Sequence, residues 1–464
     1  MAVIATGCGG EDASGESRPS FAVKPGTVPG FDWAKSDYVV RCDGSPVFLS
    51  IEGSEGWTAR VSGEVSREGS YETEHPLRPG EALAVSFKRG ETTRKFNVRC
   101  LPENFPEFAV TGPWKETPRL TLIQLKGRYA VALDRNGTPV WWLRTPEGDP
   151  GDSKFLPDGT FAYAPVRGIK VRHYVLRSLN GRKLRPITAG NRVGTDSHDL
   201  QLLPNGNYLI GAHRMVRGVD TKRFGGARRS VIDTTQVQEI TPGGKVVWSW
   251  NAYPRVGLRE TGRWWKVLAA QDQPFDIHHW NSIARRGNQI MLSFRHLDAV
   301  YLIDRRTGEI IWKLGGRPTG KSLKVLKDPR AEYPLGGQHD ARFMPDGTIT
   351  ILDNATNLKP GQPRAVRYRI DPARRTATLV EEITDPQVPL SVGFGSARLH
   401  DGSWMIGWGA MTDGVAGGYE TAGGTPSRFL TPGGASYRAN PVYGPVPTVA
   451  RLRKAMNQMA RPGG

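Results

Sequence analysis

The sequence contains no run of 18 consecutive apolar residues, and this absence excludes a helix that crosses a membrane. It also lacks a sustained heptad pattern, which excludes a coiled coil. Cysteine is scarce, with 3 residues in 464, so a small fold held together by many disulfides is excluded as well. What the chain does have is 56 glycines and 35 prolines between short runs of Val, Ile, Leu, Tyr and Trp. That composition is typical of many short strands joined by turns.

Basic residues outnumber acidic residues, and the formal net charge is +18. The basic residues are scattered along the chain, for example at Arg172, Lys183, Arg217, Arg228, Arg286, Arg305 and Arg374. A face that binds nucleic acid would instead need a basic stripe with aromatic residues between the charges. We therefore expect a generally basic surface and no nucleic-acid partner. Such a surface is compatible with small anionic substrates.

The chain begins MAVIATGCGGEDASGESRPS, in which a short apolar tip ends at Ala-Thr-Gly-Cys and a polar stretch follows. This resembles the end of a bacterial lipoprotein signal with Cys8 as the lipidated residue, although the apolar part is short and lacks a basic start. We expect an exported protein of the periplasm or cell surface, attached to the membrane by a lipid at Cys8. Export without a lipid and a cytosolic protein with an unmodified Cys8 are the alternatives.

The two other cysteines lie in similar strand-like contexts, Cys42 in YVVRCDG and Cys100 in KFNVRCLP. In an oxidising compartment they would bridge two strands of one domain. Closing that loop would stabilise the fold by about 4 kcal/mol in the chain-entropy model. Two buried free thiols are the alternative.

Composition divides the chain into four segments. Residues 1–30 are expected to be a signal remnant and disordered tether, and residues 31–112 alternate in the manner of a small β-sandwich. A proline-containing linker, LPENFPEFAVTGPW, follows. Residues 113–445 are repetitive, and residues 446–464 are expected to be a C-terminal tail, either a short helix or a frayed end.

Two sequence phrases recur within the repetitive segment. The first is an apolar strand, a Gly-containing turn and a second apolar strand: KFLPDGTFAYAPV, LQLLPNGNYLIGAH, SIARRGNQIMLSF, ARFMPDGTITILDN and ARLHDGSWMIGWG. The second ends in Trp: LDRNGTPVWWL, ITPGGKVVWSW and DRRTGEIIWKL. Each phrase is a β-hairpin, because glycine supplies the positive φ of a tight turn. Alternating hairpins predict an all-β fold, a six-bladed β-propeller in which SRFLTPGGASYR completes a closing blade.

A register of histidines runs through the first phrase. Eight residues before the turn glycines Gly159, Gly206, Gly287, Gly347 and Gly402 lie Gly151, His198, His279, His339 and Phe394. Three of the five repeats thus carry histidine at one position, although the whole chain has only nine. Equivalent positions of propeller blades are related by rotation about the axis, so the three histidines are predicted to cluster there.

Other polar residues are placed by the same alternation. Arg295 and His296 end the strand that follows the His279 strand, so a hairpin brings one of them to the same end. Arg295 would supply a forked cation for a sulfate, phosphate or carboxylate. Asn281 faces the same side as His279. Asp199 and Asp340 point away from their histidines, which favours turn or strand-edge hydrogen bonds over orientation of the imidazoles.

These residues resemble a known family. SHDLQLLPNGNYLIGAH, the HWNS of HHWNSI, LSFRH followed by VYLID, GQHDARFMPDGTITILDN and GSARLHDGSWMIGWG are similar to the motif series of the bacterial arylsulfate sulfotransferases. The resemblance covers residues 114–430. It implies a six-bladed propeller preceded by a small β-sandwich. It also implies an exported enzyme that moves sulfuryl groups from an aryl sulfate donor to a phenolic acceptor without a nucleotide sulfate donor.

The resemblance assigns roles to individual residues. His339 resembles the nucleophile that becomes a sulfohistidine, whereas His198, His279 and Arg295 resemble the groups that hold the sulfuryl oxygens and serve the phenols. Asn281 resembles a supporting donor, and Ser396 is a weak substrate-binding candidate. The choice of His279 over its neighbour His278 rests on the eight-residue register. The chemistry needs no metal and no cofactor, because a neutral imidazole attacks sulfur directly.

Two other functions fit the same sequence. Three axial histidines would also ligate a metal ion, as in a metal-dependent propeller lyase or hydrolase. The protein would otherwise be a non-catalytic cell-surface binding propeller whose histidines are idle. No pattern in the sequence indicates an oligomeric state.

Overall fold

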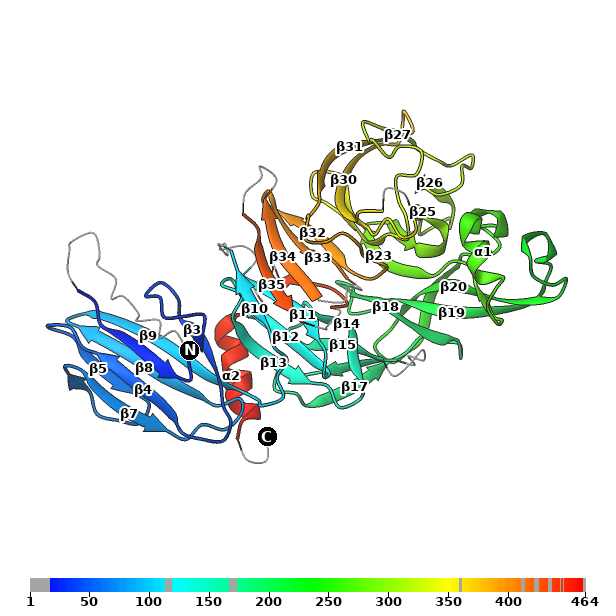
Figure 1. Ribbon diagram of the computed structural model, residues 1–464. Coiled ribbons are helices and arrows are strands. Elements are labelled where there is room, and N and C mark those ends of the chain that lie inside the picture. Colours follow the sequence, from blue (N-terminus) through cyan, green and yellow to red (C-terminus); the bar gives the residue numbers. More distant parts are fainter. Residues whose placement is uncertain are drawn as a thin grey trace.

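The computed structural model describes residues 17–112, 119–166, 173–358, 361–409, 414–420, 425–432, 436–442, 444 and 446–461. Strands make up most of the ordered elements, and the chain divides into an N-terminal pair of sheets and a larger ring of sheets (Figure 1). The prediction of an all-β, propeller-like fold is confirmed. No helix among the described residues is long and apolar enough to cross a membrane. Cys8 lies outside the described residues.

The N-terminal part is a β-sandwich, since two sheets share one apolar core that contains Phe21, Leu49 and Phe87. The larger sheet has the order β2 (Thr27–Val28), β3 (Asp37–Arg41), β9 (Thr92–Leu101), β8 (Ala82–Arg89), β5 (Thr58–Val61) and β6 (Arg67–Glu68). The smaller sheet has the order β1 (Ser20–Lys24), β4 (Val47–Glu52) and β7 (Tyr71–His75).

The expected boundary at residue 30 is wrong. β1 pairs antiparallel with β4, and β2 pairs with β3, so residues 20–28 belong to the sandwich rather than to a disordered tether. The apolar positions of β1 explain this: Phe21 and Val23 are buried on the same face of the strand. The domain therefore starts about ten residues earlier than the sequence pattern suggested.

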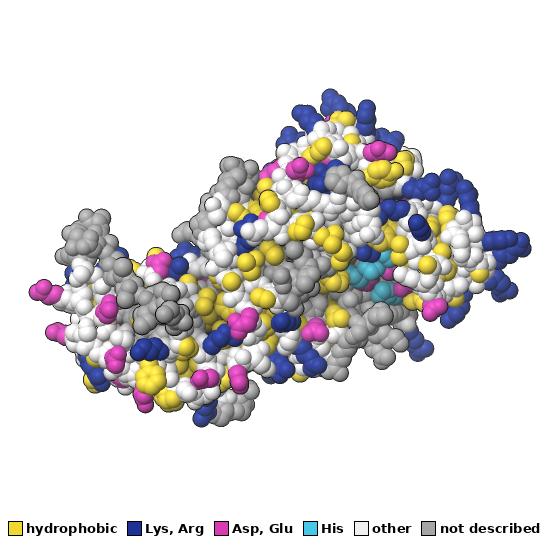
Figure 2. Space-filling view, in the orientation of Figure 1, with side chains coloured by type: hydrophobic (Ala, Val, Ile, Leu, Met, Phe, Trp, Pro, Cys, Tyr) yellow, Lys and Arg dark blue, Asp and Glu magenta, His cyan; other side chains and the backbone are white. Residues whose placement is uncertain are grey.

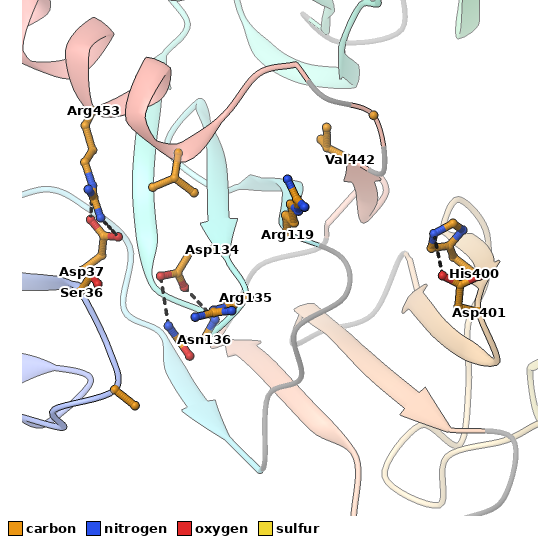
Figure 3. Close-up of a pocket in the computed structure, with 13 residues that line it drawn as sticks. Ser36, Asp37, Arg119, Asp134, Arg135, Asn136, His400, Asp401, Val442 and Arg453 are labelled. Atoms are coloured by element: carbon orange, nitrogen blue, oxygen red, sulfur yellow. Dashed lines mark hydrogen bonds and ion pairs between the residues drawn. The ribbon is translucent and has the colours of Figure 1, made fainter.

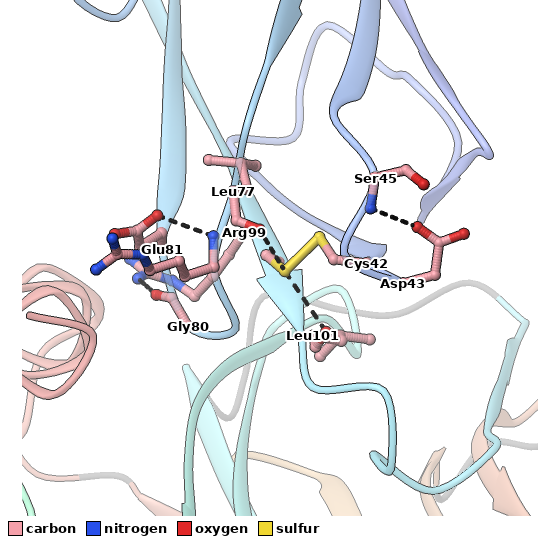
Figure 4. Close-up of a disulfide and its surroundings, with 10 residues drawn as sticks. Cys42, Asp43, Ser45, Leu77, Gly80, Glu81, Arg99 and Leu101 are labelled. Atoms are coloured by element: carbon pink, nitrogen blue, oxygen red, sulfur yellow. Dashed lines mark hydrogen bonds between the residues drawn. A yellow bond between two sulfur atoms is a disulfide. The ribbon is translucent and has the colours of Figure 1, made fainter. Parts of the chain in front are cut away.

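The disulfide prediction is confirmed. Cys42 follows β3 directly, and its partner Cys100 lies on β9, the parallel neighbour of β3 (Figure 4). Their Cα atoms are 5.7 Å apart, and 58 residues separate them along the chain. The bridge fastens the end of β3 to its neighbour β9 in the larger sandwich sheet.

Six sheets follow in chain order, each built from four consecutive hairpin strands or from three plus a distant strand. The first is β13 (Pro139–Arg144), β12 (Tyr129–Asp134), β11 (Leu120–Leu125) and β36 (Asn440–Val442); the second is β14 (Asp149–Phe155), β15 (Phe161–Val166), β16 (Tyr174–Arg177) and β17 (Lys183–Ile187). The third is β18 (Gly194–Leu202), β19 (Tyr208–Val219), β20 (Ser230–Ile240) and β21 (Val246–Asn251), with β22 (Phe275–Asp276) on β20.

The remaining three sheets repeat this plan. The fourth is β23 (Trp280–Arg286), β24 (Gln289–Phe294), β25 (Ala299–Asp304) and β26 (Ile310–Gly315). The fifth is β28 (His339–Phe343), β29 (Thr348–Asp353), β30 (Arg364–Asp371) and β31 (Thr376–Ile383), with β27 (Lys324–Leu326) at its edge. The sixth is β32 (Ser396–His400), β33 (Ser403–Gly407), β34 (Gly414–Glu420), β35 (Ser427–Thr431) and β10 (Ala109–Thr111).

The innermost strands close into a ring. β14 contacts β18, β18 contacts β23, β23 contacts β28, β28 contacts β32, and β32 contacts β36. Two strands that are distant in sequence complete the first and sixth sheets. β36 pairs with β11 of the first sheet, and β10 pairs with β35 of the sixth. The repetitive domain therefore begins at residue 109 rather than 113. SRFLT forms the outer part of the last sheet, and the closing inner strand is Asn440–Val442 instead.

The turn chemistry explains the repeating hairpins. Gly159, Gly206 and Gly347 have φ of +80°, +80° and +84°, which a residue with a side chain rarely adopts. All five first-phrase sequences form the inner hairpin of a sheet, and the three Trp-ending phrases form outer hairpins. The two-phrase prediction is thus confirmed strand by strand.

The C-terminal tail is a helix that packs rather than frays. In α2 (Val449–Met459), Leu452 and Met456 are buried against β13, and the Thr448 side chain accepts the N–H of Arg451 (Figure 1). Arg453 pairs with Asp37 of the sandwich, which ties the helix to both domains. The helix borders an interdomain cavity of about 780 Å³ (Figure 3).

Candidate active site

Of the three predicted histidines, His198 and His279 are in contact, and His339 lies near enough to His198 for the charge of His198 to lower the pKa of His339. The ring centroids of His198 and His279 are 4.9 Å apart, and His279 lies 4.6 Å from His296. On the other side, His339 faces Phe394 at 6.3 Å, and Phe394 faces Tyr437 at 4.9 Å. Figure 2 shows histidine side chains gathered at the surface beside the basic end of the molecule.

The imidazole of His339 is held in one tautomer. Its Nδ1 lies 2.7 Å from Oδ1 of Asn354, whose Nδ2 donates to Ser391 and to the Phe394 carbonyl. Nδ1 therefore carries the proton, and Nε2 carries the lone pair, which accepts the N–H of Phe394 at 3.1 Å. Burial, reinforced by the positive charge of Arg295, holds the pKa of His339 well below its usual value.

His198 and His279 are each oriented by a carboxylate just upstream. Nδ1 of His198 lies 2.6 Å from Asp196, and Nδ1 of His279 lies 2.6 Å from Asp276. Each carboxylate also accepts the backbone N–H of its own histidine, so both Nε2 atoms are left for a ligand. Burial lowers the pKa of His279, against the opposing effect of Asp276. Neither aspartate was among the predicted site residues; the signals are TDSH and FDIHH, in which Asp precedes His by two or three positions.

A fourth histidine, His213 on β19, extends this arrangement and was also missed. Its Nδ1 lies 2.8 Å from Asp233, and its Nε2 lies 3.7 Å from Asp196. Although burial opposes the charge, the Asp196 carboxylate and the hydrogen bond to Asp233 raise the pKa of His213 to about 10. His213 is therefore an imidazolium at neutral pH. It contacts the same carboxylate, Asp196, that orients His198.

Arg295 lies between His296 on one side and His339 on the other. Its guanidinium donates to Nε2 of His296 at 2.9 Å and to the Val392 carbonyl at 3.1 Å, and it stacks 4.4 Å from the ring of Trp264. A Cβ built on Gly393 would lie 3.8 Å from both Arg295 Nε and His339 Cε1. Gly393 thus keeps the space between the cation and the candidate nucleophile open.

Two other predicted residues lie away from the open part of the site. Asn281 is fully buried and donates to the Gln338 carbonyl at 2.7 Å, while its Oδ1 has no partner among the described residues. The structure does not support Ser396 as a substrate-binding residue. Its buried hydroxyl donates to the Ala439 carbonyl and accepts the Ala439 N–H, so it joins the last sheet to the closing strand.

The structure places the two adjacent histidines, His278 and His279, in different surroundings. His278 is buried with its Nδ1 2.8 Å from the Thr234 hydroxyl, and burial lowers its pKa to about 4. Its side chain packs against Phe294, away from the ring of histidines. His279 has a φ of +48°, and this left-handed backbone turns its side chain toward His198 instead.

Asp199 and Asp340 do not orient histidines, and each accepts a backbone N–H of the next inner strand, as predicted for strand-edge hydrogen bonds. Asp199 accepts the backbone N–H of Ile283 on the next inner strand and pairs with Arg342 at 2.7 Å. Asp340 pairs with Arg398 at 2.6 Å and with Arg342 at 2.8 Å. All of these charges are at least mostly buried, so the aspartates hold a charged network that links inner strands beneath the histidines.

One group of side chains has the spacing of a metal site. Ligand atoms of Asp276, His279 and His296 all lie within 4.8 Å of one another. Two of the three groups already have partners at their lone pairs, since Asp276 accepts from His279 and Nε2 of His296 accepts from Arg295. His339 is not a member of the group, and the Arg295 cation would repel a metal ion there. The arrangement suits an anion better than a cation.

The model of the arylsulfotransferase (ASST) family matches residues 112–415. The chain belongs to the arylsulfotransferase family. The match runs from the start of the ring of sheets to the inner hairpin of the sixth sheet, β32 and β33. It includes every histidine of the site. Membership supports an arylsulfotransferase function in general terms, with an aryl sulfate donor and a phenol acceptor. No curated protein matches this chain.

Several solved structures resemble this chain. TolB from Acinetobacter baumannii is 11% identical with a TM-score of 0.41, covering 79% of this chain and 81% of its own. The Cps50 (Swd1) β-propeller domain from Myceliophteria thermophila is 13% identical with a TM-score of 0.39, covering 70% and 87%. A putative 6-phosphogluconolactonase from Bacteroides fragilis is 10% identical with a TM-score of 0.37, covering 83% and 98%. No functional conclusion follows from these similarities.

Proposed function

We propose that the protein transfers a sulfuryl group from an aryl sulfate to a phenol through a covalent sulfohistidine on Nε2 of His339, without a nucleotide sulfate donor. The observation that carries the proposal is the tautomer of His339, which has Nδ1–H on Asn354 and its lone pair on Nε2. Because the pKa of His339 lies well below its usual value, the imidazole stays neutral and nucleophilic at neutral pH.

In the first half-reaction, the Nε2 lone pair attacks sulfur and the bond from sulfur to the aryl oxygen breaks. The phenolate departs with that electron pair and takes a proton from Nε2 of His198, which must enter this half-reaction with a proton on both ring nitrogens. Arg295 is positioned to neutralise the sulfuryl oxygens, since it lies beside His339 across Gly393. Like phosphoryl transfer, the step depends mainly on in-line positioning and charge stabilisation.

The second half-reaction reverses these events. The acceptor phenol gives its proton to the same histidine, and its oxygen attacks the sulfur of the sulfohistidine. The bond from nitrogen to sulfur breaks, and its electron pair returns to Nε2 of His339. The carboxylates of Asp196 and Asp276 hold the two histidines in the orientation that both transfers need.

Access to Nε2 requires a local movement. His339 is 1% exposed, and the Phe394 N–H occupies the lone pair that must attack. Phe394 lies in the loop between β31 and β32, with glycines on both sides and a φ of +62°. We infer that this loop shifts when the donor enters, after which the freed N–H donates to a sulfuryl oxygen.

The test is mass spectrometry of the intact protein after brief exposure to 4-nitrophenyl sulfate without acceptor. We expect a gain of one sulfuryl group that maps to His339 and disappears when phenol is added. The His339→Asn variant should lose the adduct and nearly all turnover, whereas His400→Asn, in an exposed histidine of the sixth sheet, should retain both. Turnover without an adduct on His339 would contradict the proposal.

A metal-dependent reaction makes a different prediction for the same assay. Because Asp276 and Nε2 of His296 already accept hydrogen bonds and Arg295 adds a positive charge beside them, we expect dialysis against a chelator to leave turnover unchanged. Stoichiometric metal whose removal abolishes activity would favour the metal enzyme, and no turnover with any aryl sulfate would favour a binding propeller.

We also propose that the protein is exported and lipid-anchored at Cys8. The Cys42–Cys100 disulfide supports export, because such bonds persist in oxidising compartments. Fractionation of the producing cells tests this: the protein should be recovered with membranes, and Cys8→Ala should release it. Recovery in the cytosol would contradict the proposal.

A further inference from the structure

The hairpin of the third sheet extends well beyond its neighbours. β19 and β20 have 12 and 11 residues, whereas the equivalent strands β24 and β25 have 6 each. The extension is held down by a small apolar core of its own, in which Val219 and Ile232 pack with Trp265. The extension therefore has a fixed shape, although the ring of sheets does not need it for closure.

A groove of about 1190 Å³ lies between the tip of this extension and the 3-10 helix η2 (Leu258–Trp264). We call it the basic groove, because Lys222, Arg223, Arg259 and Arg317 line it. All four side chains are exposed, and within the described part of the chain none forms an ion pair or a side-chain hydrogen bond. The groove's Glu260 is already bound by Lys313 and Tyr301.

Further cations continue the groove onto the tip of the hairpin. Arg217, Arg228 and Arg229 are exposed there, and Figure 2 shows Lys and Arg side chains crowding this end of the molecule. The basic residues that are scattered in the sequence are thus partly gathered by the fold. Exposed cations without partners repel one another, so the arrangement favours an anionic ligand that spans several of them.

We propose that the basic groove binds an anionic polysaccharide, that is, a carbohydrate chain carrying sulfate or carboxylate groups. The groove exceeds the usual size of a small-molecule pocket, and its charges are spread out, which favours a polymer over a single small anion. Nucleic acid fits less well, because single strands need open aromatic faces on which bases stack. The aromatic residue of the groove, Phe224, is already stacked on Trp265 at 4.8 Å.

The proposal is independent of sulfuryl transfer, although the two sites are neighbours. The 3-10 helix η2 borders the groove at Leu258 and reaches the candidate active site at Trp264, which lies beside Arg295 and His296. A polysaccharide in the groove would therefore hold the open end of the active site close to anionic cell-surface material. Binding is expected even in the His339→Asn variant.

The experiment measures the affinity of the full chain for fluorescently labelled dextran sulfate and polygalacturonate, with neutral dextran and single-stranded DNA as comparators. We expect both anionic polysaccharides to bind, with an affinity that falls as salt rises from about 50 to about 200 mM. Lys222→Gln/Arg223→Gln should weaken binding by about tenfold and reduce the salt dependence. The matched control is Lys88→Gln/Lys95→Gln, two exposed lysines of the sandwich, which should change the affinity less than twofold.

Thermal melting keeps the comparison interpretable, since both pairs are exposed and neither variant should lose stability. Equal weakening by the two pairs would show that only net charge matters and would overturn the proposal. Tighter binding of DNA than of either polysaccharide would overturn it in favour of a nucleic-acid site. Binding of neither polysaccharide would overturn it outright.

Discussion

Nδ1 of His339 lies 2.7 Å from Oδ1 of Asn354, and this contact decides which nitrogen of the candidate nucleophile carries its lone pair. An amide oxygen fixes the tautomer without adding a negative charge. Burial and the nearby Arg295 can therefore keep the pKa of His339 well below its usual value. A carboxylate in the same place would orient the ring equally well but would favour the imidazolium.

The first prediction follows from that difference. In Asn354→Asp the new carboxylate should raise the pKa of His339, so that the imidazole becomes protonated at mildly acidic pH. We expect the acid limb of the kcat/KM profile to move to higher pH, with a roughly ten- to hundredfold loss near pH 5.5 and a smaller loss at pH 8. The exposed Asn180→Asp should follow the unmodified protein, and parallel profiles for Asn354→Asp would contradict the assignment.

Two glycines of one loop should separate catalysis from stability. A Cβ on Gly393 meets Arg295 and His339 at ordinary contact distance, so Gly393→Ala should fold normally while filling the space for the sulfuryl group. We expect kcat/KM to fall by about ten- to hundredfold with an unchanged melting temperature. Gly395 has a φ of +93°, and its Cβ would lie 2.2 Å from Leu352, so Gly395→Ala should lower the melting temperature. Full activity in Gly393→Ala would contradict the placement of the sulfuryl group.

Much of this site is visible in the sequence because the fold repeats. Turn glycines fix the hairpins, and residues at the same distance from the turn glycine lie at equivalent places around the axis. His198, His279 and His339 share that distance, so the sequence alone predicts that they lie together. Arg295 follows from the same pairing. Local patterns carry such information because each hairpin folds from its own turn and strand preferences.

Phe394 could not be predicted because it reaches His339 from another sheet, so no spacing rule relates the two residues. The other missed residues are local: Asn354 directly follows the partner strand of the His339 hairpin, and Asp196 and Asp276 lie two or three positions before their histidines. The contacts of Ser396 could not be predicted for the same reason as those of Phe394, because its partner Ala439 is distant in sequence and directly precedes the closing strand. The sandwich boundary failed because β1 is short and follows a polar stretch.

His213 should contribute stability that depends on its charge. Its pKa is raised to about 10 in the folded state, so its stabilising effect is complete below pH 6.5 and is lost as pH rises through about 10. We expect His213→Gln to melt below the unmodified protein at pH 7 and to match it above pH 10. The exposed His400→Gln is the control at both values. A constant difference between pH 7 and pH 10.5 would show that the imidazolium is not the stabilising form.

Asp340 should matter for stability rather than chemistry. Asp340→Asn leaves Arg342 and Arg398 without their shared buried carboxylate, which we expect to cost roughly 3–5 kcal/mol of unfolding free energy in urea titrations. Asp346→Asn removes a more exposed carboxylate that pairs with Arg367, and it should cost less than about 1 kcal/mol. Equal losses would mean that the buried network does not hold the inner strands together.

The interdomain cavity should give the fold a pH dependence near neutrality. Burial, with the negative charge of Asp37, raises the pKa of Asp134 to about 6, whereas the unfolded chain would titrate near 4. The folded state therefore binds a proton first, and its stability rises as pH falls through about 6 toward about 4. Asp134→Asn removes this charge while its amide oxygen still accepts the N–H groups of Asn136 and Thr138.

We expect Asp134→Asn to be more stable than the unmodified protein at pH 7.5, by roughly 1–3 kcal/mol, and to lose nearly all of that advantage by about pH 3.5. Urea denaturation at the two pH values measures the difference. Asp401→Asn alters another carboxylate of the same cavity, but its side chain is 81% exposed, so it should show no such dependence. A variant that is less stable than the unmodified protein at pH 7.5 would mean that the Asp134 carboxylate is stabilised by its hydrogen bonds more than it is penalised by burial.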